Sequence, residues 1–211
     1  MRVLVATRNA GKVREIREML AARPEIEAVG LAELGIEETE EEDAVEAFDT
    51  FEENALAKAR YFARMTGELT LADDSGIAVD ALGGAPGVRS RRFAPVDEAR
   101  GERQDEANNR HLLDLLRATP DAERGARYVC SVALADAAGR ETVFTGTCDG
   151  TILRAPRGTG GFGYDPLFYL EEEGMTFGEL PSARKHEISH RGKAVRAAVE
   201  ALLAGLGSGG G

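Results

Sequence analysis

Apolar residues near the start of the chain change from a continuous run to helical spacing within a few positions. Residues 2–6 form a short apolar run bounded by polar residues, which predicts a buried strand. From position 12 the apolar residues recur every three or four positions up to Leu20, and Pro24 ends the pattern. We therefore expect a strand, a polar loop over 7–12 and an amphipathic helix, in that order.

The clearest helix signal covers residues 51–66. Thr50 is followed three positions later by Glu53, which is the spacing of a capping box. In this motif the Thr50 side chain accepts a hydrogen bond from the backbone N–H of Glu53, and the Glu53 side chain reaches back to Thr50. Apolar residues follow at helical spacing, and Gly67 is a residue type that often ends helices. The acid-rich stretch 37–49 has little periodicity and predicts a solvated loop.

The remaining pattern alternates strands and helices, which is typical of an α/β fold. A buried strand is predicted at 69–72, with Asp73 and Asp74 at its carboxyl end, where open α/β sheets bind ligands. The other expected elements are a strand over 77–82, a turn-rich loop over 83–87, a helix over 104–118, a hairpin of strands 127–135 and 141–147, short strands at 150–153 and 166–170, and a helix over 193–206. We expect one domain over 1–206 and a flexible glycine-rich tail over 207–211.

Composition and charge exclude several classes of protein. With 43% hydrophobic and 30% charged residues the chain can bury a core and keep a polar surface. No apolar stretch approaches the roughly 20 residues that cross a bilayer. The 26 basic against 37 acidic residues give a net charge of −11, which argues against a broad nucleic-acid or membrane surface. An anionic ligand must therefore meet a local group of cations.

The two cysteines indicate a reduced environment. Cys130 and Cys148 lie in apolar, strand-like segments and no CxxC pair occurs, so we interpret both as small buried residues rather than metal ligands or nucleophiles. The chain begins Met1-Arg2-Val3 without a secretory apolar region. A cytoplasmic protein is expected.

Lys12 lies at the start of the first predicted helix. Backbone amides and the helix dipole favour phosphate at such a position, and a bound anion would compensate for a lysine at the unfavourable end of the helix. An exposed surface lysine explains the same pattern. The loop is not a Walker A sequence, because GxxxxG does not precede the lysine.

Asp73 and Asp74 are candidate metal ligands. Adjacent carboxylates are unfavourable unless cations or hydrogen bonds meet them, and Mg²⁺ binds one or two carboxylates together with substrate phosphates. Successive side chains of a strand point to opposite faces, so we expect the two acids to have different roles. An Asp-Ser-Gly turn that ends the strand is the alternative interpretation.

Two later segments carry further polar chemistry. Residues 158–163 match GxGxxG, but no helix signal follows, so the aromatic faces of Phe162 and Tyr164 favour base stacking over dinucleotide binding. A glycine-rich bulge with core aromatics is the alternative. The basic segment 185–191 precedes the last helix, where cations are unfavourable for the helix dipole. Solvated surface residues are the alternative to a functional role for this segment.

Five motifs in one order are more specific than any of these signals. They are TRNAGKVREI, TFEENALAKAR, LADDSGIAVDALGGAPGVRSRRFA, GTGGFGYDPLFY and KHEISHRGKA. From about Val3 to Leu203 the chain resembles the Ham1/inosine triphosphatase family of noncanonical purine nucleoside triphosphate pyrophosphatases. The resemblance implies an α/β fold with a long twisted mixed sheet flanked by helices, two lobes around a central cleft, and a homodimer. It also implies Mg²⁺-dependent hydrolysis of ITP, dITP and XTP to the monophosphate and pyrophosphate.

The resemblance further implies roles for individual residues. Asp74 would be the proton acceptor and a metal ligand, and Lys58 a catalytic lysine. The second metal carboxylate falls on Glu46, with Glu41 and Glu42 as alternatives. Triphosphate and other substrate contacts fall on Thr7, Arg8, Asn9, Ala10, Gly11, Lys12, Ser75 and Lys185. Base and sugar contacts fall on Phe162, Gly163, Tyr164 and Asp165, and contacts with the oxygen-bearing purine edge on His190 and Arg191.

Two other functions share the acids and lysines. A metal-dependent phosphomonoesterase would release orthophosphate instead of pyrophosphate. A regulatory module would bind the nucleotide without turnover. In each case the partner is a small-molecule nucleotide, with no nucleic-acid polymer and no membrane.

Overall fold

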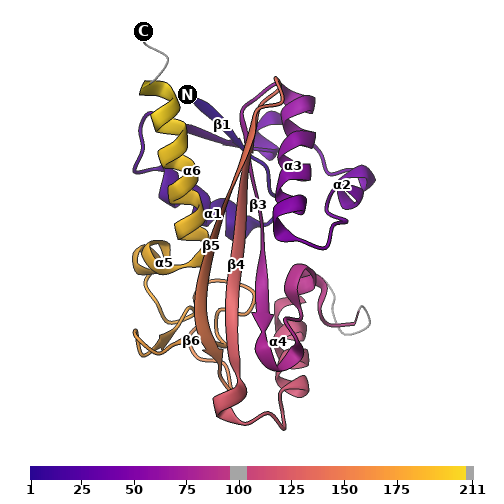
Figure 1. The fold of residues 1–211 in the computed structure, drawn as a ribbon, viewed down its shortest axis with the longest axis vertical. Helices are drawn as coiled ribbons and strands as arrows, with labels where there is room; N and C mark the ends of the chain where they lie inside the picture. The colour runs from indigo at the N-terminus through magenta and orange to yellow at the C-terminus, as the bar shows by residue number, and fades with distance from the viewer. Residues whose placement is uncertain (96–103, 208–211) are drawn as a thin grey trace. The chain divides into compact units, whose positions relative to one another are not determined.

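The computed structural model describes residues 1–95 and 104–207 (Figure 1). Of the tail predicted over 207–211, Gly207 ends the last helix, and residues 208–211 lie outside the described part. Within the described ranges, no helix has both the length and the apolar character needed to cross a membrane.

The fold is a mixed seven-stranded sheet with helices beside it. The strand order is β2-β1-β3-β4-β5-β6-β7; β1 pairs in parallel with β2 and β3, and β6 pairs antiparallel with β5 and β7. The strands are β1 (Arg2–Val5), β2 (Glu27–Gly30), β3 (Thr70–Val79), β4 (Gly125–Ala135), β5 (Glu141–Ile152), β6 (Phe168–Leu170) and β7 (Met175–Thr176). The helices are α1 (Ala10–Leu20), α2 (Glu40–Val45), α3 (Phe51–Thr66), α4 (Gln104–Leu115), α5 (Ser182–Ile188) and α6 (His190–Gly207). The predicted α/β class is confirmed.

The residues form two compact units. The first comprises Met1–Asp74, Cys130–Gly146 and His190–Gly211, and the second Ser75–Val129 and Thr147–Ser189. Each unit has its own apolar clusters, and no described cluster draws on both.

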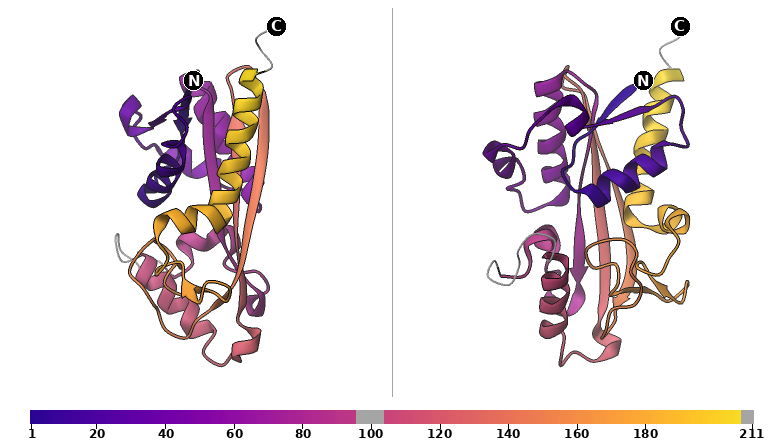
Figure 2. Two further views of the ribbon diagram at one scale, coloured as in Figure 1. Left: turned by 90° about the vertical axis from the view of Figure 1, so that its left-hand side faces the viewer. Right: turned by 180° about the vertical axis from the view of Figure 1, so that it is seen from behind.

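Helices cover both faces of the strands in the first unit (Figure 2). On one face, alternate strand residues pack against α1 and α6: Val3, Val5, Leu71, Cys130, Val132 and Leu134 meet Ile16, Leu20, Val195 and Ala198. On the other face the intervening residues pack against α3: Leu4, Ala6, Ala72, Ala133 and Ala135 meet Ala55, Ala59 and Phe62. Successive side chains of a strand point to opposite faces, so the position of a residue in the strand determines which helices it packs against.

The second unit is built around aromatic rings. The ring of Tyr128 meets that of Phe168 edge to face with centroids 4.7 Å apart, and stacks on that of Phe177 at 5.7 Å. Ile77 and Val79 of β3 and Leu112 of α4 belong to the same buried cluster. Aromatic pairs in these orientations stabilise a core beyond the apolar area that they bury.

Helix α3 follows the sequence prediction closely. Thr50 Oγ1 accepts a hydrogen bond from Glu53 N at 3.2 Å and donates to Glu53 Oε2 at 2.7 Å. Gly67 ends the helix with φ at +73°, in the left-handed region that glycine adopts without strain. The signals are local, so the sequence alone contains them.

Strand β3 differs from the prediction. It runs without a break from Thr70 to Val79, so Asp73 and Asp74 lie inside a strand rather than at its carboxyl end. The expected strand end was wrong, and the alternative Asp-Ser-Gly turn is excluded for the same reason. Side chains of α1, α6 and α3 pair with these two carboxylates inside the strand.

Other elements also depart from expectation. The acid-rich stretch contains the short helix α2, so the predicted loop was wrong over Glu40–Val45. Helix α6 begins at His190 rather than at position 193, and α5 precedes it. Strand β5 joins the two separate strands that were expected between 141 and 153.

Gly76 offers a test of packing in the second unit. A Cβ at this position would lie 2.5 Å from Gly87 O and closer still to Ser90 Oγ, which itself accepts from Ile77 N at 2.9 Å. We expect Gly76→Ala to lower the free energy of unfolding by about 1–3 kcal/mol through overpacking, measured by urea denaturation. Gly205→Ala on α6, where a Cβ meets nothing within 4 Å, is the control and should be neutral or slightly stabilising. Equal effects of the two substitutions would contradict the packing at Gly76.

Candidate active site

The loop between β1 and α1 forms a capped helix start. Asn9 Oδ1 accepts from Lys12 N at 3.0 Å, and Asn9 N donates to Thr7 Oγ1 at 3.3 Å. Helix α1 begins at Ala10, followed by Gly11, so the order of strand, loop and helix is confirmed, while the predicted loop was wrong over 10–12. Contacts of this loop with phosphate stay a prediction.

Arg8 connects this loop to the acidic segment. Its Nη2 and Nε donate to the two carboxylate oxygens of Glu42 at 2.6 and 3.0 Å, and Nη1 donates to Ile36 O at 2.7 Å. The Glu42 carboxylate raises the pKa of Arg8 further. Arg8 and Glu42 thus pair with each other, whereas Glu46 pairs with Lys58.

Asp73 projects from β3 toward α1 and α6 and is fully buried. Its Oδ2 lies 3.1 Å from Lys12 Nζ and 3.2 Å from Arg191 Nε. Arg191 also forms an ion pair with Glu15, and both side chains are buried. Burial alone raises the pKa of Asp73, but the charges of Lys12 and Arg191 outweigh it and hold the pKa well below its usual range.

Asp74 projects to the opposite face of β3, toward α3. Its Oδ2 accepts from Asn54 Nδ2 at 3.0 Å. Burial raises the pKa of Asp74, and the negative charges of Glu46 and Asp73 act in the same direction against the lysines Lys12 and Lys58. The sequence prediction that the two acids differ in role is consistent with these opposite pKa shifts.

Lys58 of α3 forms an ion pair with Glu46, which follows α2. Burial lowers the pKa of Lys58, but Glu46, Asp73 and Asp74 together raise it above its usual value. For Glu46, burial opposes ionisation and the charge of Lys58 overcomes it, so its pKa is lowered. Lys58 and Glu46 therefore stay charged beside an aspartate whose proton affinity is increased.

Two consecutive residues of β3 therefore have opposite electrostatic environments. The charges of Lys12 and Arg191 favour the ionised form of Asp73, whereas burial favours the protonated form of Asp74. Pairs of titratable groups with opposite shifts are a common feature of catalytic sites. Cys130 lies near this network, and its burial raises the thiol pKa to about 12, which agrees with an unreactive cysteine.

A second group of predicted residues lies in the second unit. Asp165 Oδ2 accepts from Lys185 Nζ at 2.6 Å and from Phe162 N at 2.8 Å. Lys185 Nζ also lies over the rings of Phe162 and Phe177, 5.3 and 5.4 Å from their centroids. The structure thus brings Phe162, Asp165 and Lys185 together, as part of a loop without the helix of a dinucleotide fingerprint.

Tyr164 and Gly163 are held by the scaffold of the second unit. Tyr164 is buried in the core, and its hydroxyl donates to Ser90 O at 2.8 Å. Gly163 N donates to Asp105 Oδ2 at 2.7 Å, and Gly163 O accepts from Asn109 Nδ2 at 2.9 Å. The alternative of core aromatics thus describes Tyr164, while Phe162 is only half-buried.

The other predicted residues lie at element boundaries. Ser75 follows Asp74 in β3 and is half-buried. His190 is the buried first residue of α6, next to Arg191. Their contacts with a substrate stay predictions.

Two residues of the site were missed from the sequence. Glu15 lies one helical turn after Lys12 on α1, and Asn54 one turn before Lys58 on α3. Residues three or four apart share a helix face. Their spacing of three or four positions from Lys12 and Lys58 could have predicted both residues as part of the site.

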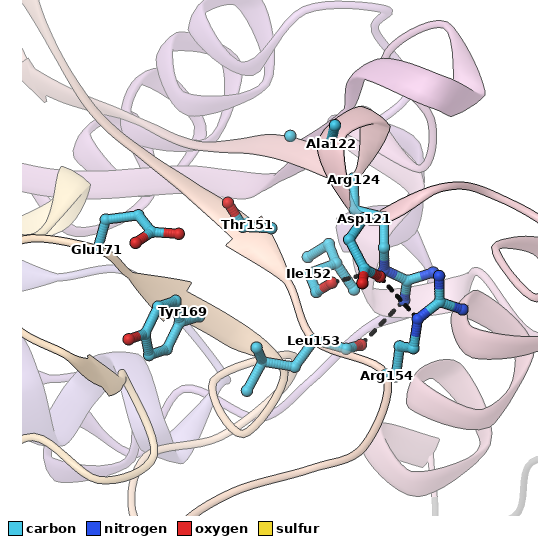
Figure 3. A pocket seen from close by; sticks show the side chains of 10 residues that line it. Asp121, Ala122, Arg124, Thr151, Ile152, Leu153, Arg154, Tyr169 and Glu171 are labelled. Carbon is cyan, nitrogen blue, oxygen red and sulfur yellow. Dashed lines mark hydrogen bonds and ion pairs between the residues drawn. The ribbon is translucent and has the colours of Figure 1, made fainter.

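A surface pocket elsewhere in the second unit involves none of these residues (Figure 3). Its arginines bond to the protein: Arg124 donates to Ile152 O, Leu116 O and Leu153 O at 2.7, 2.7 and 2.9 Å. Arg154 Nε donates to Asp121 Oδ1 at 2.7 Å. The guanidinium groups stabilise the scaffold, so this pocket is not the candidate site.

Comparison with known proteins finds relatives over nearly the whole chain. The sequence profile of the Ham1 family matches residues 3–201. A protein of Desulforamulus reducens named dITP/XTP pyrophosphatase is 48% identical over 204 residues, 96% of each chain. One of Thermus thermophilus with the same name is 46% identical, over 97% of this chain and 93% of its own.

A solved structure of a HAM1 protein from Coxiella burnetii is also similar. It superposes with a TM-score of 0.82 at 35% identity and covers 97% of this chain and 99% of its own. The fold and the buried network of acids and basic residues define an α/β protein with a charged candidate site. The chain belongs to the Ham1 family.

The buried charge network yields a stability prediction. Arg191→Met removes the partner of Glu15 and one partner of Asp73, and we expect it to lower the free energy of unfolding by about 3–5 kcal/mol. Arg140→Met is the control, because Arg140 pairs with Asp136 while its side chain is 87% exposed, and such pairs contribute about 0–1 kcal/mol. Urea denaturation followed by circular dichroism measures both. A loss at Arg191 no larger than that at Arg140 would contradict the network.

Proposed function

We propose that this protein hydrolyses noncanonical purine nucleoside triphosphates, namely dITP, XTP and ITP, to the monophosphate and pyrophosphate. The observation that carries the proposal is the environment of Asp74. This carboxylate accepts a hydrogen bond from Asn54 Nδ2 at 3.0 Å and lies in the electric field of Lys58, Lys12 and Glu46, in a chain of net charge −11. Full-length similarity to proteins named dITP/XTP pyrophosphatase supports the substrate class.

Glu46 and Asp74 are the residues that would hold Mg²⁺. Carboxylate oxygens are the hard ligands that this ion prefers, and it uses one or two of them when substrate phosphates and water complete its shell. The described residues contain no group of three or more His, Cys, Asp or Glu side chains suited to a metal, and a two-carboxylate set of this kind fits that mode of binding. When bound, the ion neutralises charge on phosphate oxygens.

The chain's own residues divide the remaining work. Asp74 accepts a proton from the water that attacks the α-phosphorus as the bond to the leaving pyrophosphate breaks. Lys12 and Lys58 meet the negative charge that grows on the leaving pyrophosphate. A phosphate contact of Lys185 stays a prediction from the resemblance. Thr7, Arg8, Asn9, Ala10, Gly11 and Ser75 complete the phosphate contacts.

Recognition of the base is a separate part of this proposal. Phe162, Gly163 and Asp165 would contact base and sugar, while Tyr164 holds this loop from the core through its hydrogen bond to Ser90 O. His190 would contact the oxygen at purine C6, next to Arg191, which is held by Asp73 and Glu15. A donor facing that oxygen would face an amino group in ATP, and a mismatched buried group costs about 1–3 kcal/mol. We also propose that the protein is a cytoplasmic homodimer with a small-molecule substrate.

Product analysis tests the reaction. We expect dITP, XTP and ITP with Mg²⁺ to give a colorimetric phosphate signal only after inorganic pyrophosphatase is added. We expect Asp74→Asn to reduce kcat by about 10²–10⁴-fold, since it removes the proton acceptor. Asp149→Asn, at an exposed ion pair with Arg127, is the control and should leave kcat unchanged.

Each alternative function has its own outcome in this assay. Orthophosphate without the helper enzyme would identify a phosphomonoesterase-type reaction. Nucleotide binding without product at any Mg²⁺ concentration, retained in Asp74→Asn, would identify a regulatory module.

Base recognition has a separate test. We expect His190→Ala to lower the ITP to ATP ratio of kcat/KM by about tenfold, which corresponds to the loss of one discriminating hydrogen bond. The Mg²⁺ dependence should stay the same. An unchanged ratio would remove His190 from base recognition.

A further inference from the structure

Asn54 connects three parts of the candidate site through one carboxamide. It lies on α3 and is 2% exposed. Its Oδ1 accepts from Phe48 N at 2.9 Å, while Nδ2 donates to Phe48 O at 3.1 Å and to Asp74 Oδ2 at 3.0 Å. Both N–H groups and the oxygen of the amide are therefore engaged, and the three bonds fix its orientation.

The two bonds to Phe48 hold the segment that carries Glu46. Phe48 follows Glu46 by two residues in the connection between α2 and α3. Its ring is 46% exposed, so burial of the ring does not fix the segment. Instead, the Asn54 side chain fixes the segment, because it bonds to both the N–H and the C=O of Phe48, as a neighbouring β-strand does.

The third bond holds the carboxylate of Asp74. A hydrogen bond to one oxygen of a carboxylate restricts its rotation and determines the directions that its lone pairs face. Lys58, four residues after Asn54 on the same helix face, holds the Glu46 side chain through their ion pair. One face of α3 thus positions Glu46 by backbone and side chain, and Asp74 by its carboxylate.

We propose that Asn54 is a positioning residue that sets the relative placement of the Glu46 and Asp74 carboxylates for a divalent cation. This inference rests on the proposed function, in which these two carboxylates hold Mg²⁺. Asn54 itself does not contact the ion or the substrate in this role. Groups that orient metal ligands typically change metal affinity by 10–100-fold when they are removed.

Asn54→Leu tests the proposal, because leucine has a similar volume and cannot form any of the three hydrogen bonds. We expect the dissociation constant for Mn²⁺ alone, measured from the EPR signal of the free ion, to rise by about tenfold or more. The Mg²⁺ concentration at half-maximal hydrolysis should rise by a similar factor. At saturating Mg²⁺, KM for the nucleotide should be unchanged and kcat should largely recover.

Thr50→Ala is the matched control at the same end of α3. It removes the hydrogen bond from Glu53 N to Thr50 Oγ1 and touches neither Phe48 nor Asp74. We expect a lower unfolding temperature with unchanged Mn²⁺ affinity. Asn54→Ala, which leaves space instead of an apolar side chain, should show the same loss of metal affinity as Asn54→Leu and serves if the leucine variant does not fold.

The outcomes separate this inference from the proposed function. Wild-type hydrolysis to pyrophosphate tests the function alone. If the wild type is active and both Asn54 variants keep its Mn²⁺ affinity and Mg²⁺ requirement, the positioning role is wrong and the function stands. If Thr50→Ala loses metal affinity as much as the Asn54 variants, the effect is one of helix stability and the positioning role is also wrong. A wild type that neither hydrolyses the nucleotides nor binds Mn²⁺ would overturn both.

Discussion

The alternation of side chains along β3 is the constraint on which the candidate site depends. Asp73 and Asp74 are adjacent, and the pleat of the strand directs them to opposite faces. One face is covered by α1 and α6, and the other by α3. The first acid therefore meets Lys12 and Arg191, and the second meets Asn54. A shift of register by one residue would exchange these environments.

The buried network around Asp73 contributes more to specificity of structure than to net stability. Removing charged groups from water costs about as much as their attraction returns, so a complete network is close to neutral, while an incomplete one is strongly unfavourable. Lys12, Glu15 and Arg191 come from two helices far apart in the sequence, and only the correct packing of both on β3 completes the network. The site and the fold of the first unit thus require each other.

Local signals predicted helix α3 and its caps, because Thr50, Glu53 and Gly67 act within a few residues of one another. The same kind of reasoning ended a strand at Asp73, because a carboxylate inside a strand is unfavourable by itself. Its partner Arg191 is 118 residues away, and no local pattern contains that contact. Helix α2 was missed for a similar reason, since Arg8 pairs with Glu42 across 34 positions. The motifs predicted Asp74, Lys58 and Glu46 as site residues, but not Asn54, which donates a hydrogen bond to Asp74.

The same pairings explain how an acidic protein could bind a polyphosphate. Lys12 and Lys58 are paired with Asp73 and Glu46, so both ammonium groups are held in place by carboxylates of the protein. An anion that approaches Lys58 competes with Glu46 and by itself would deprive that carboxylate of its partner. A polyphosphate that arrives with a divalent cation supplies Glu46 with a new positive partner, so the exchange leaves neither Lys58 nor Glu46 without a charged partner. Charge balance within the first unit therefore favours a metal-bound polyphosphate over a bare anion.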